Sequence, residues 1–211
     1  MRPAAVVASG LRRSVGGRRL LDGVDLRVPV GARLLLVSEP DEAASLLLRI
    51  MAGLVRPAGG SFDLAGRLAD YDAAERLRRI DAAIEQFRLG PGLDRPVSRG
   101  GSPLAERVAL AAAMLTDPEV LLLDDPLRSI DPAERARLLA VPGKRRTVVL
   151  ASRYPASEEG LVNQVALLLN GRLAIHARRD DLEAQGLPLT LKGIASLAVM
   201  RTQTMPRAAG A

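Results

Sequence analysis

The sequence contains no cysteine and a single histidine, His176. The first absence excludes a disulfide framework, a thiolate metal site and a cysteine nucleophile, and the second excludes any site that needs two imidazoles. A metal site would have to rest on carboxylate and hydroxyl oxygens. Aromatic residues make up only 2% of the chain, which leaves few rings on which nucleic-acid bases could stack.

Long hydrophobic runs are missing as well. The purely apolar run "VALAAAML" (108–115) near the middle of the chain is far shorter than the roughly 20 residues that span a bilayer. The N-terminal stretch lacks the apolar core of a signal peptide. The sequence therefore predicts a cytoplasmic protein.

The charge is +6, and the basic residues are nearly all arginine, since only Lys144 and Lys192 are lysines. A basic balance can indicate nucleic acid or an anionic membrane surface. Here the arginines alternate with acids along the chain. We therefore expect no nucleic-acid partner. Arginine-mediated binding of nucleic acid or anionic lipid stays an alternative, which predicts a clustered basic face and steeply salt-dependent binding.

Apolar runs alternate with helical patterns along most of the chain. "RLLLV" (33–37), "EVLLLDD" (119–125) and "RRTVVLAS" (145–152) are typical of strands buried on both faces, and helical patterns follow the first two. "VDLRV" (24–28) alternates like a half-exposed strand, and "QVALLLNGRLAIHA" (164–177) predicts a hairpin around Asn170–Gly171, with His176 at its surface. The pattern indicates a mostly parallel α/β sheet with antiparallel hairpins at its edges.

The order of these segments resembles the nucleotide-binding subunit of ABC transporters. "LLLRIMAGLVRPAGGSFDLAGR" (46–67) is similar to the segment after that family's phosphate loop, and residues 94–139 resemble its signature helix, Walker B strand and D-loop. The resemblance implies an α/β, P-loop NTPase-like fold with an N-terminal antiparallel β subdomain and a truncated helical subdomain. It places a single ABC ATPase-like domain at 1–190, a helical remnant at about 72–116, and a C-terminal helix with a flexible tail at 191–211.

The phosphate loop departs from the family pattern. That loop uses glycines, so that backbone N–H groups close on the phosphates, and a lysine that reaches them. In this chain, other residues stand at the glycine positions and alanine at the lysine position, whereas the magnesium-binding hydroxyl is kept. The residues are Ser38, Asp41 and Ala43 for glycine, Ala44 for lysine, Ser45 for the hydroxyl and Leu46 after it.

The loop is also acidic, with Glu39, Asp41 and Glu42. Losing the lysine removes a contact worth ~1.5–3 kcal/mol. Each carboxylate ~5 Å from a phosphate charge opposes binding by ~3 kcal/mol at an effective dielectric of ~20, whereas a helix N-terminus offers only ~0.3–1 kcal/mol. Repulsion exceeds attraction. We expect the acidic side chains to occupy the helix N-terminal amides themselves, as N-cap carboxylates do.

Three further positions depart from the family, and a fourth is kept. Val15 stands where an aromatic residue stacks on adenine, and Asp125 where a glutamate polarises the attacking water. Arg153 replaces the switch histidine, and Asp124 keeps the magnesium-associated carboxylate of the Walker B strand. Aspartate is one methylene shorter than glutamate, which displaces the acid from hydrogen-bonding range of the water. Asp124 and Ser45 would hold a metal only together with bound magnesium nucleotide.

The signature loop reads "GGSPL" (100–104), in which Gly101 and Ser102 mimic parts of the family pattern and Pro103 removes a backbone donor. The D-loop keeps Asp131. Gln86 matches the end of the helical subdomain better than the family's glutamine loop, so the loop and most of that subdomain are predicted to be deleted.

Together these departures predict a subunit that has lost ATP hydrolysis and needs no cofactor, although the family uses Mg-ATP. It would be a structural or regulatory partner of other protein subunits, such as an ABC transporter membrane subunit or a second ATP-binding subunit, at the inner face of the cell membrane. The alternatives are a slow ATPase that uses Asp124, Ser45 and Mg²⁺ with Arg153 as a cationic phosphate contact, the arginine-mediated binder above, and a relic without a selected function.

The C-terminal segment "LPLTLKGIASLAVM" (187–200) offers two interpretations. One helical face carries Leu191, Ile194, Leu197 and Ala198, with Met200 beside it. This face is a candidate docking surface, and it is equally consistent with a helix that covers the sheet.

Overall fold

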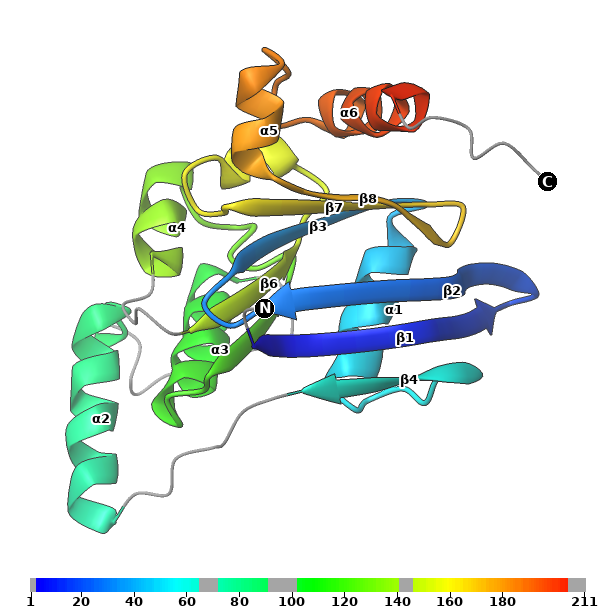
Figure 1. Cartoon of the computed structure of the whole chain (residues 1–211). Coiled ribbons are helices and arrows are strands. Elements are labelled where there is room, and N and C mark those ends of the chain that lie inside the picture. Colours follow the sequence, from blue (N-terminus) through cyan, green and yellow to red (C-terminus); the bar gives the residue numbers. More distant parts are fainter. Residues whose placement is uncertain (1–2, 65–71, 91–101, 141–145, 205–211) are drawn as a thin grey trace.

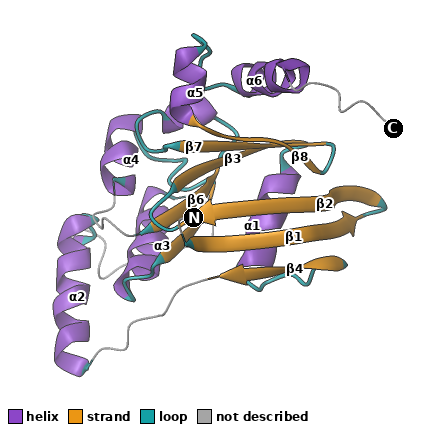
Figure 2. Ribbon diagram, in the orientation of Figure 1, coloured by secondary structure: helices purple, strands orange, loops and turns teal. Residues whose placement is uncertain are grey.

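A computed structural model describes residues 3–64, 72–90, 102–140 and 146–204. The chain forms two sheets with helices between and around them (Figures 1 and 2). The strands are β1 (Ala4–Val15), β2 (Arg18–Pro29), β3 (Arg33–Glu39), β4 (Gly59–Leu64), β5 (Val120–Asp124), β6 (Thr147–Ala151), β7 (Gln164–Leu169) and β8 (Arg172–Arg178). The helices are α1 (Glu42–Met51), α2 (Ala73–Gln86), α3 (Pro103–Leu115), α4 (Pro132–Leu139), the 3₁₀ turn η2 (Pro155–Glu158), α5 (Arg179–Ala184) and α6 (Leu191–Thr204).

The larger sheet has the order β5-β6-β3-β7-β8, and its first four strands are parallel. β8 returns antiparallel to β7 through the turn at Asn170 and Gly171, whose φ values of 49° and 77° suit a tight hairpin. The smaller sheet has the order β2-β1-β4 and is antiparallel throughout. The predicted α/β class, with a mostly parallel sheet and an N-terminal antiparallel subdomain, is confirmed.

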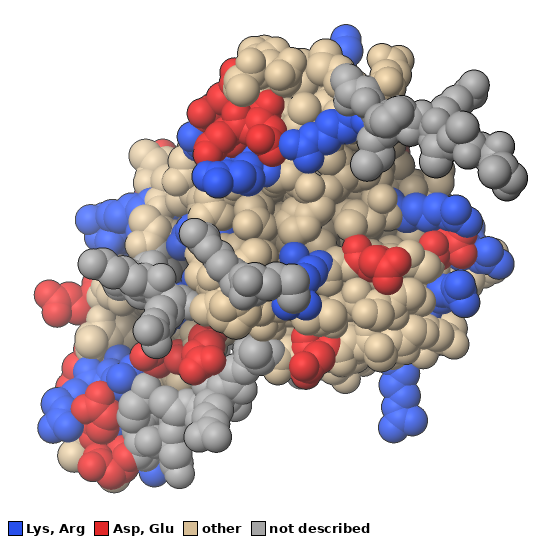
Figure 3. All heavy atoms as spheres, in the orientation of Figure 1, with Lys and Arg blue, Asp and Glu red and all other residues tan. Residues whose placement is uncertain are grey.

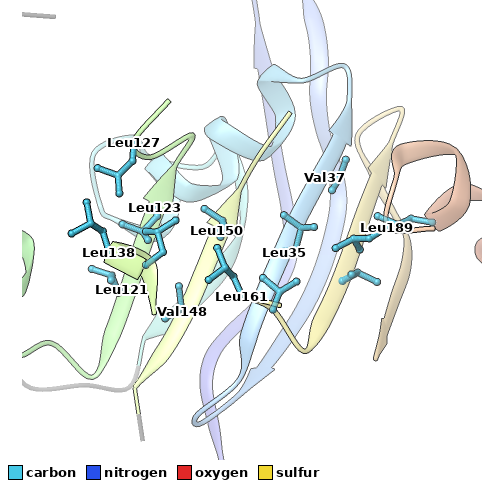
Figure 4. Close-up of a cluster of buried hydrophobic side chains, with 14 of the residues drawn as sticks. Leu35, Val37, Leu121, Leu123, Leu127, Leu138, Val148, Leu150, Leu161 and Leu189 are labelled. Atoms are coloured by element: carbon cyan, nitrogen blue, oxygen red, sulfur yellow. The ribbon is translucent and has the colours of Figure 1, made fainter. Parts of the chain in front are cut away.

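Strand β3 lies at the centre because both of its faces are apolar. Leu35 and Val37 contribute to one hydrophobic cluster, which contains residues of α3, α4 and α6 (Figure 4). Leu34 and Leu36 contribute to the other, which joins the larger sheet to α1 and the smaller sheet. Helix α1 therefore lies between the two sheets, and its N-terminus is fixed at the carboxyl end of β3.

Helix α2 lies at the side of the molecule and has no buried residue (Figure 1). Its N-cap, Asp72, accepts a hydrogen bond of 2.8 Å from the Glu75 N–H. Phe87, directly after the helix, is buried and anchors it to the core cluster that includes α3. The predicted helical remnant thus contains α2 and α3, while residues 91–101 between them lie outside the described residues.

Helix α6 covers the larger sheet, which makes the prediction of a docking surface on its apolar face wrong. Ile194, Leu197 and Ala198 are buried in the core cluster, and Leu191 packs against it. The helix contacts β7 and β8, so this face is used within the chain. Met200 remains exposed, and the predicted tail from residue 205 lies beyond the described part of the chain.

None of the helices in the described ranges is both long enough and apolar enough to cross a membrane.

Candidate functional site

The carboxyl ends of the central parallel strands border a cleft of about 940 Å³. Residues of the β1–β2 hairpin, the β3–α1 loop, α1, α3 and the segments after β5 and β6 line it. The ends of parallel strands meet at one edge of a sheet, which is where ligands of open α/β folds bind. Most of the residues singled out from the sequence line this cleft, namely Val15, Ser38, Asp41, Ala44, Ser45, Leu46, Asp124, Asp125 and Arg153. Ala43 does not line it.

The β3–α1 loop is closed by hydrogen bonds within the chain. Ser38 is buried, and its hydroxyl oxygen accepts a hydrogen bond of 2.9 Å from the Ala44 N–H. The same oxygen lies 2.8 Å from the Pro40 carbonyl and 3.0 Å from the Asp41 carbonyl, to which the hydroxyl can donate. The Ala43 N–H donates to the Pro40 carbonyl at 3.1 Å. Two amide groups at the start of α1 are thus already satisfied.

The prediction that acidic side chains occupy these amides is wrong. Asp41 is the N-cap of α1, but its side chain accepts no capping hydrogen bond. Its backbone has φ −52° and ψ −36°, a helical conformation, whereas a capping side chain needs an extended N-cap residue to fold back over the helix. Ser38 takes this role from the preceding strand, and Asp41 and Glu42 remain exposed.

Ser45 and Asp124, to which the resemblance gives a role only with magnesium nucleotide, lie in contact. The Ser45 hydroxyl donates a hydrogen bond of 2.6 Å to Asp124 Oδ1. Ser45 lies in the first turn of α1, and Asp124 ends β5, so the contact joins the two elements across the cleft. The described residues contain no group of three or more His, Cys, Asp or Glu that could hold a metal ion. Magnesium would therefore need ligands from a bound molecule.

Asp125 is held by arginine. Its Oδ2 accepts a hydrogen bond of 2.8 Å from Arg153 Nε, and Arg128 Nη1 lies 4.0 Å from the same oxygen. The hydrogen bond to Asp125, together with its negative charge, raises the pKa of Arg153. The register of β5 against β6 explains the contact, because Asp124 pairs with Ala151 and both chains leave the sheet at the same edge. The sequence placed both residues at the site without predicting this ion pair.

Ser102 and Asp131 act as helix caps. The Ser102 hydroxyl accepts from the Ala105 N–H at 3.1 Å at the start of α3. Asp131 accepts from the N–H groups of Ala133 and Glu134 at 2.8 and 3.1 Å at the start of α4. Neither lines the cleft. Gly101 lies outside the described residues.

A buried ion pair connects the segments at this edge of the sheet, and the sequence did not predict it. Glu158 is fully buried, and Arg135 of α4 donates to its Oε1. Ser152 donates to the same oxygen at 2.9 Å, and Arg135 Nε donates to the Pro126 carbonyl at 3.0 Å. These contacts tie the segments after β5 and β6 to α4 and η2. Only the tertiary fold brings residues so distant in the sequence together.

Arg18 and Arg49 also line the cleft, and neither was predicted from the sequence. A signal for Arg49 was present: Glu42, Ser45 and Arg49 stand at i, i+3 and i+7 of α1, the spacing of one helix face. Arg18 begins β2 directly after the hairpin turn next to Val15. His176 and Gln86 do not line the cleft.

No family model matches the chain. The chain is 31% identical over 200 residues to the aliphatic sulfonates import ATP-binding protein SsuB 1 of Nocardia farcinica, with 82% of this chain and 81% of that protein covered. It is 25% identical to the daunorubicin resistance ATP-binding protein DrrA3 of Streptomyces coeruleorubidus, over 88% of this chain and 72% of that protein. Among solved structures, an ATP-binding subunit of an ABC transporter superposes with a TM-score of 0.73 at 20% identity, over 94% of this chain and 99% of that one.

Proposed function

The chain belongs to the family of ATP-binding subunits of ABC transporters, and within that family we propose that it has lost ATP hydrolysis. It acts as a structural or regulatory subunit of a membrane-associated complex. Its partners are an ABC transporter membrane subunit or a second ATP-binding subunit, and it reaches the inner face of the membrane only through them. The relatives that it matches over 72% and 81% of their lengths are a resistance and an import ATP-binding protein, which supports a role in transport.

The observation that carries the proposal is the closed β3–α1 loop. A triphosphate binds such a loop through backbone N–H groups that point at its oxygens. In this chain the Ala44 N–H donates to Ser38 and the Ala43 N–H to Pro40. A phosphate would have to displace contacts that the protein makes by itself, so the residues present do not fit a nucleoside triphosphate.

The charges of the β3–α1 loop also oppose the binding of a triphosphate. Alanine at position 44 offers no cation, and Asp41 and Glu42 are exposed on the cleft. The loss of a lysine contact costs ~1.5–3 kcal/mol, and each carboxylate within ~5 Å of a phosphate charge adds ~3 kcal/mol of repulsion at an effective dielectric of ~20. The partial charge of the α1 N-terminus, ~0.3–1 kcal/mol per interaction, does not offset these terms.

The acid that would polarise water is also engaged. Both oxygens of Asp125 face Arg153, one at 2.8 Å from Nε and the other at 3.3 Å from the backbone N–H. A general base must lie within hydrogen-bonding reach of the water it activates and have a free lone pair for that water's proton. This ion pair directs Asp125 toward the segment after β6 instead.

A slow ATPase is the second candidate, because one specific contact favours it. Ser45 and Asp124 remain 2.6 Å apart, the arrangement that a magnesium-nucleotide complex would need from its protein ligands. This candidate predicts measurable binding of MgATP and the loss of that binding in Asp124→Ala.

Arginine-mediated binding of nucleic acid or lipid receives no support from the surface in view. Basic and acidic side chains alternate there without a large basic patch (Figure 3). Several arginines are paired with carboxylates, including Arg172 with Asp22 at 2.8 Å and Arg107 with Glu134 at 2.7 Å. Paired arginines are less available to phosphates.

Calorimetric titration of about 0.1 mM protein with MgATP, up to millimolar nucleotide, tests the proposal, since a Kd of about 1 mM still corresponds to roughly 4 kcal/mol. We expect no heat of binding. The triple variant Ser38→Gly, Asp41→Gly, Ala44→Lys restores two of the three glycines and the lysine and serves as the positive control; its fold is checked by thermal melting. Micromolar binding by the wild type would refute the proposal, and its loss in Asp124→Ala and Arg153→Ala would then support the slow ATPase.

A further inference from the structure

We propose that the cleft binds a small organic anion with an apolar body, and that Arg18 and Arg49 hold its acidic group. This inference goes beyond the proposed function, because it assigns the cleft a ligand of a class other than nucleotides.

The two arginines differ from the others in the cleft. Arg128 and Arg153 face Asp125, at 4.0 and 2.8 Å. The side chains of Arg18 and Arg49 are exposed, line the cleft, and form neither a hydrogen bond nor an ion pair with any other described residue. A guanidinium presents five N–H donors in a planar fork that matches a carboxylate, sulfonate or phosphate oxygen pair. Arg18 and Arg49 thus offer the cleft two guanidinium groups for an anion.

The remaining acids of the cleft are distributed so that only one end attracts an anion. Asp124 accepts from Ser45, Asp125 pairs with Arg153, and Glu106 accepts from Ser129 N–H and hydroxyl, each at 3.0 Å. The carboxylates without such contacts among described residues are Asp41 and Glu42, at the start of α1.

Glu42 and Arg49 lie on one face of α1, seven residues apart, which corresponds to about 10 Å along the helix axis. The free acids therefore mark one end of the cleft and Arg49 the other. A nucleotide places its phosphates at the N-terminus of this helix. The cleft has the opposite polarity, so the acidic group of its ligand lies at the Arg49 end, away from Asp41 and Glu42.

The wall between the two ends is apolar. Leu20, Leu46, Leu110 and Leu123 are buried residues that line the cleft, and Ala109 and Ala113 of α3 line it as well. The volume of about 940 Å³ lies in the range of small-molecule sites. An apolar body of about 10 Å with one acidic group would bury its hydrocarbon against these leucines.

Anilinonaphthalene sulfonate is a suitable probe, because it joins a sulfonate to an apolar ring system and fluoresces when its rings leave water. We expect saturable binding by the full chain, with displacement by decanoate and none by decylamine, whose charge is positive. Binding should weaken about tenfold or more in Arg18→Ala/Arg49→Ala, since each charge-assisted contact is worth about one decade of affinity or more.

Two variants control for charge and for shape. Arg27→Ala/Arg76→Ala removes the same charge from exposed arginines outside the cleft and should bind like the wild type. Ala109→Phe keeps both cleft arginines and fills the space beside α3, so it should abolish binding. Thermal melting confirms that each variant folds.

Absence of saturable binding, or equal weakening in both arginine pairs, would overturn the inference. Displacement of the probe by micromolar MgATP would refute the loss of nucleotide binding while leaving the anion site in place. If the probe does not bind and MgATP gives no heat of binding, the anion site is refuted, and the proposed loss of nucleotide binding stands.

Discussion

The interior of the parallel sheet and the edge at which its strands end differ in the kind of contact that their residues make. In the interior, β3 and β6 are buried along almost their whole length by aliphatic side chains. At the edge, the residues that the resemblance aligns with the phosphate loop and the water-polarising acid make contacts internal to the chain. The fold needs the first set of residues and not the second.

The residues that stabilise the fold therefore differ from those that determine the chemistry of the cleft. Burial of apolar area is the main favourable term in folding, and it depends on the leucines and valines of the sheet. The cleft residues contribute mainly local hydrogen bonds and ion pairs, which are worth less. A chain can therefore keep the architecture while its site changes, and mutations in the two regions should have clearly different effects.

The largest effect is expected for Leu35→Ala in β3. Leu35 is fully buried in the core cluster, and truncation of such a residue leaves a cavity that lowers the free energy of unfolding by about 2–5 kcal/mol. Leu54, which is 77% exposed, is the matched control, and Leu54→Ala should change that free energy by less than about 0.5 kcal/mol. Urea unfolding measures both. Equal losses would contradict the assignment of β3 to the centre of the core.

An intermediate effect is expected for Ser38→Ala, at the boundary between the two regions. The variant removes the acceptor of the Ala44 N–H and leaves that buried amide unsatisfied, at a cost of about 1–3 kcal/mol in the free energy of unfolding. Ser61, exposed on β4, provides the comparison, and Ser61→Ala should be nearly neutral. If Ser38→Ala is equally neutral, the loop is not held by this hydroxyl.

Much of the interior could be predicted from the sequence, and less of the edge. Uninterrupted apolar runs identified β3, β5 and β6, and the Asn170–Gly171 pair identified the last hairpin. These signals are local. The resemblance singled out Ser45 and Asp124, and the structure brings them into contact.

The missed features depend on distant parts of the chain. The Ser38 cap depends on the helical backbone of Asp41, and the Asp125–Arg153 pair on the register of two strands. A helix that docks a partner and a helix that covers the sheet have the same apolar periodicity, so the sequence of α6 fits both interpretations. The contacts of Ile194 and Leu197 with the core show that α6 covers the sheet. Periodicity identifies an apolar face without identifying what covers it.

The smallest effect is expected at β8, where the histidine was predicted to lie at the surface. His176 is instead half-buried, with Nε2 at 2.9 Å from Gln164 Oε1, and burial lowers its pKa below the ordinary value of 6.5. Above pH 6.5 the imidazole is neutral in the folded and the unfolded chain, and its contribution to stability is complete. As the pH falls through 6.5, the unfolded chain binds a proton first, so the folded state loses stability until the folded imidazole is protonated as well.

His176→Gln isolates this contribution, because the chain has no other histidine. The free energy of unfolding of the wild type should fall more than that of the variant between about pH 7.5 and pH 5. Carboxylates titrate in both proteins, and their contribution cancels in the difference. An equal fall would mean that the imidazole has the same pKa in both states and is as solvated as a surface residue. A larger fall in the wild type would show that His176 titrates with a lowered pKa within the β7–β8 hairpin, which contacts α6. Mild acid would then destabilise this hairpin rather than the cleft.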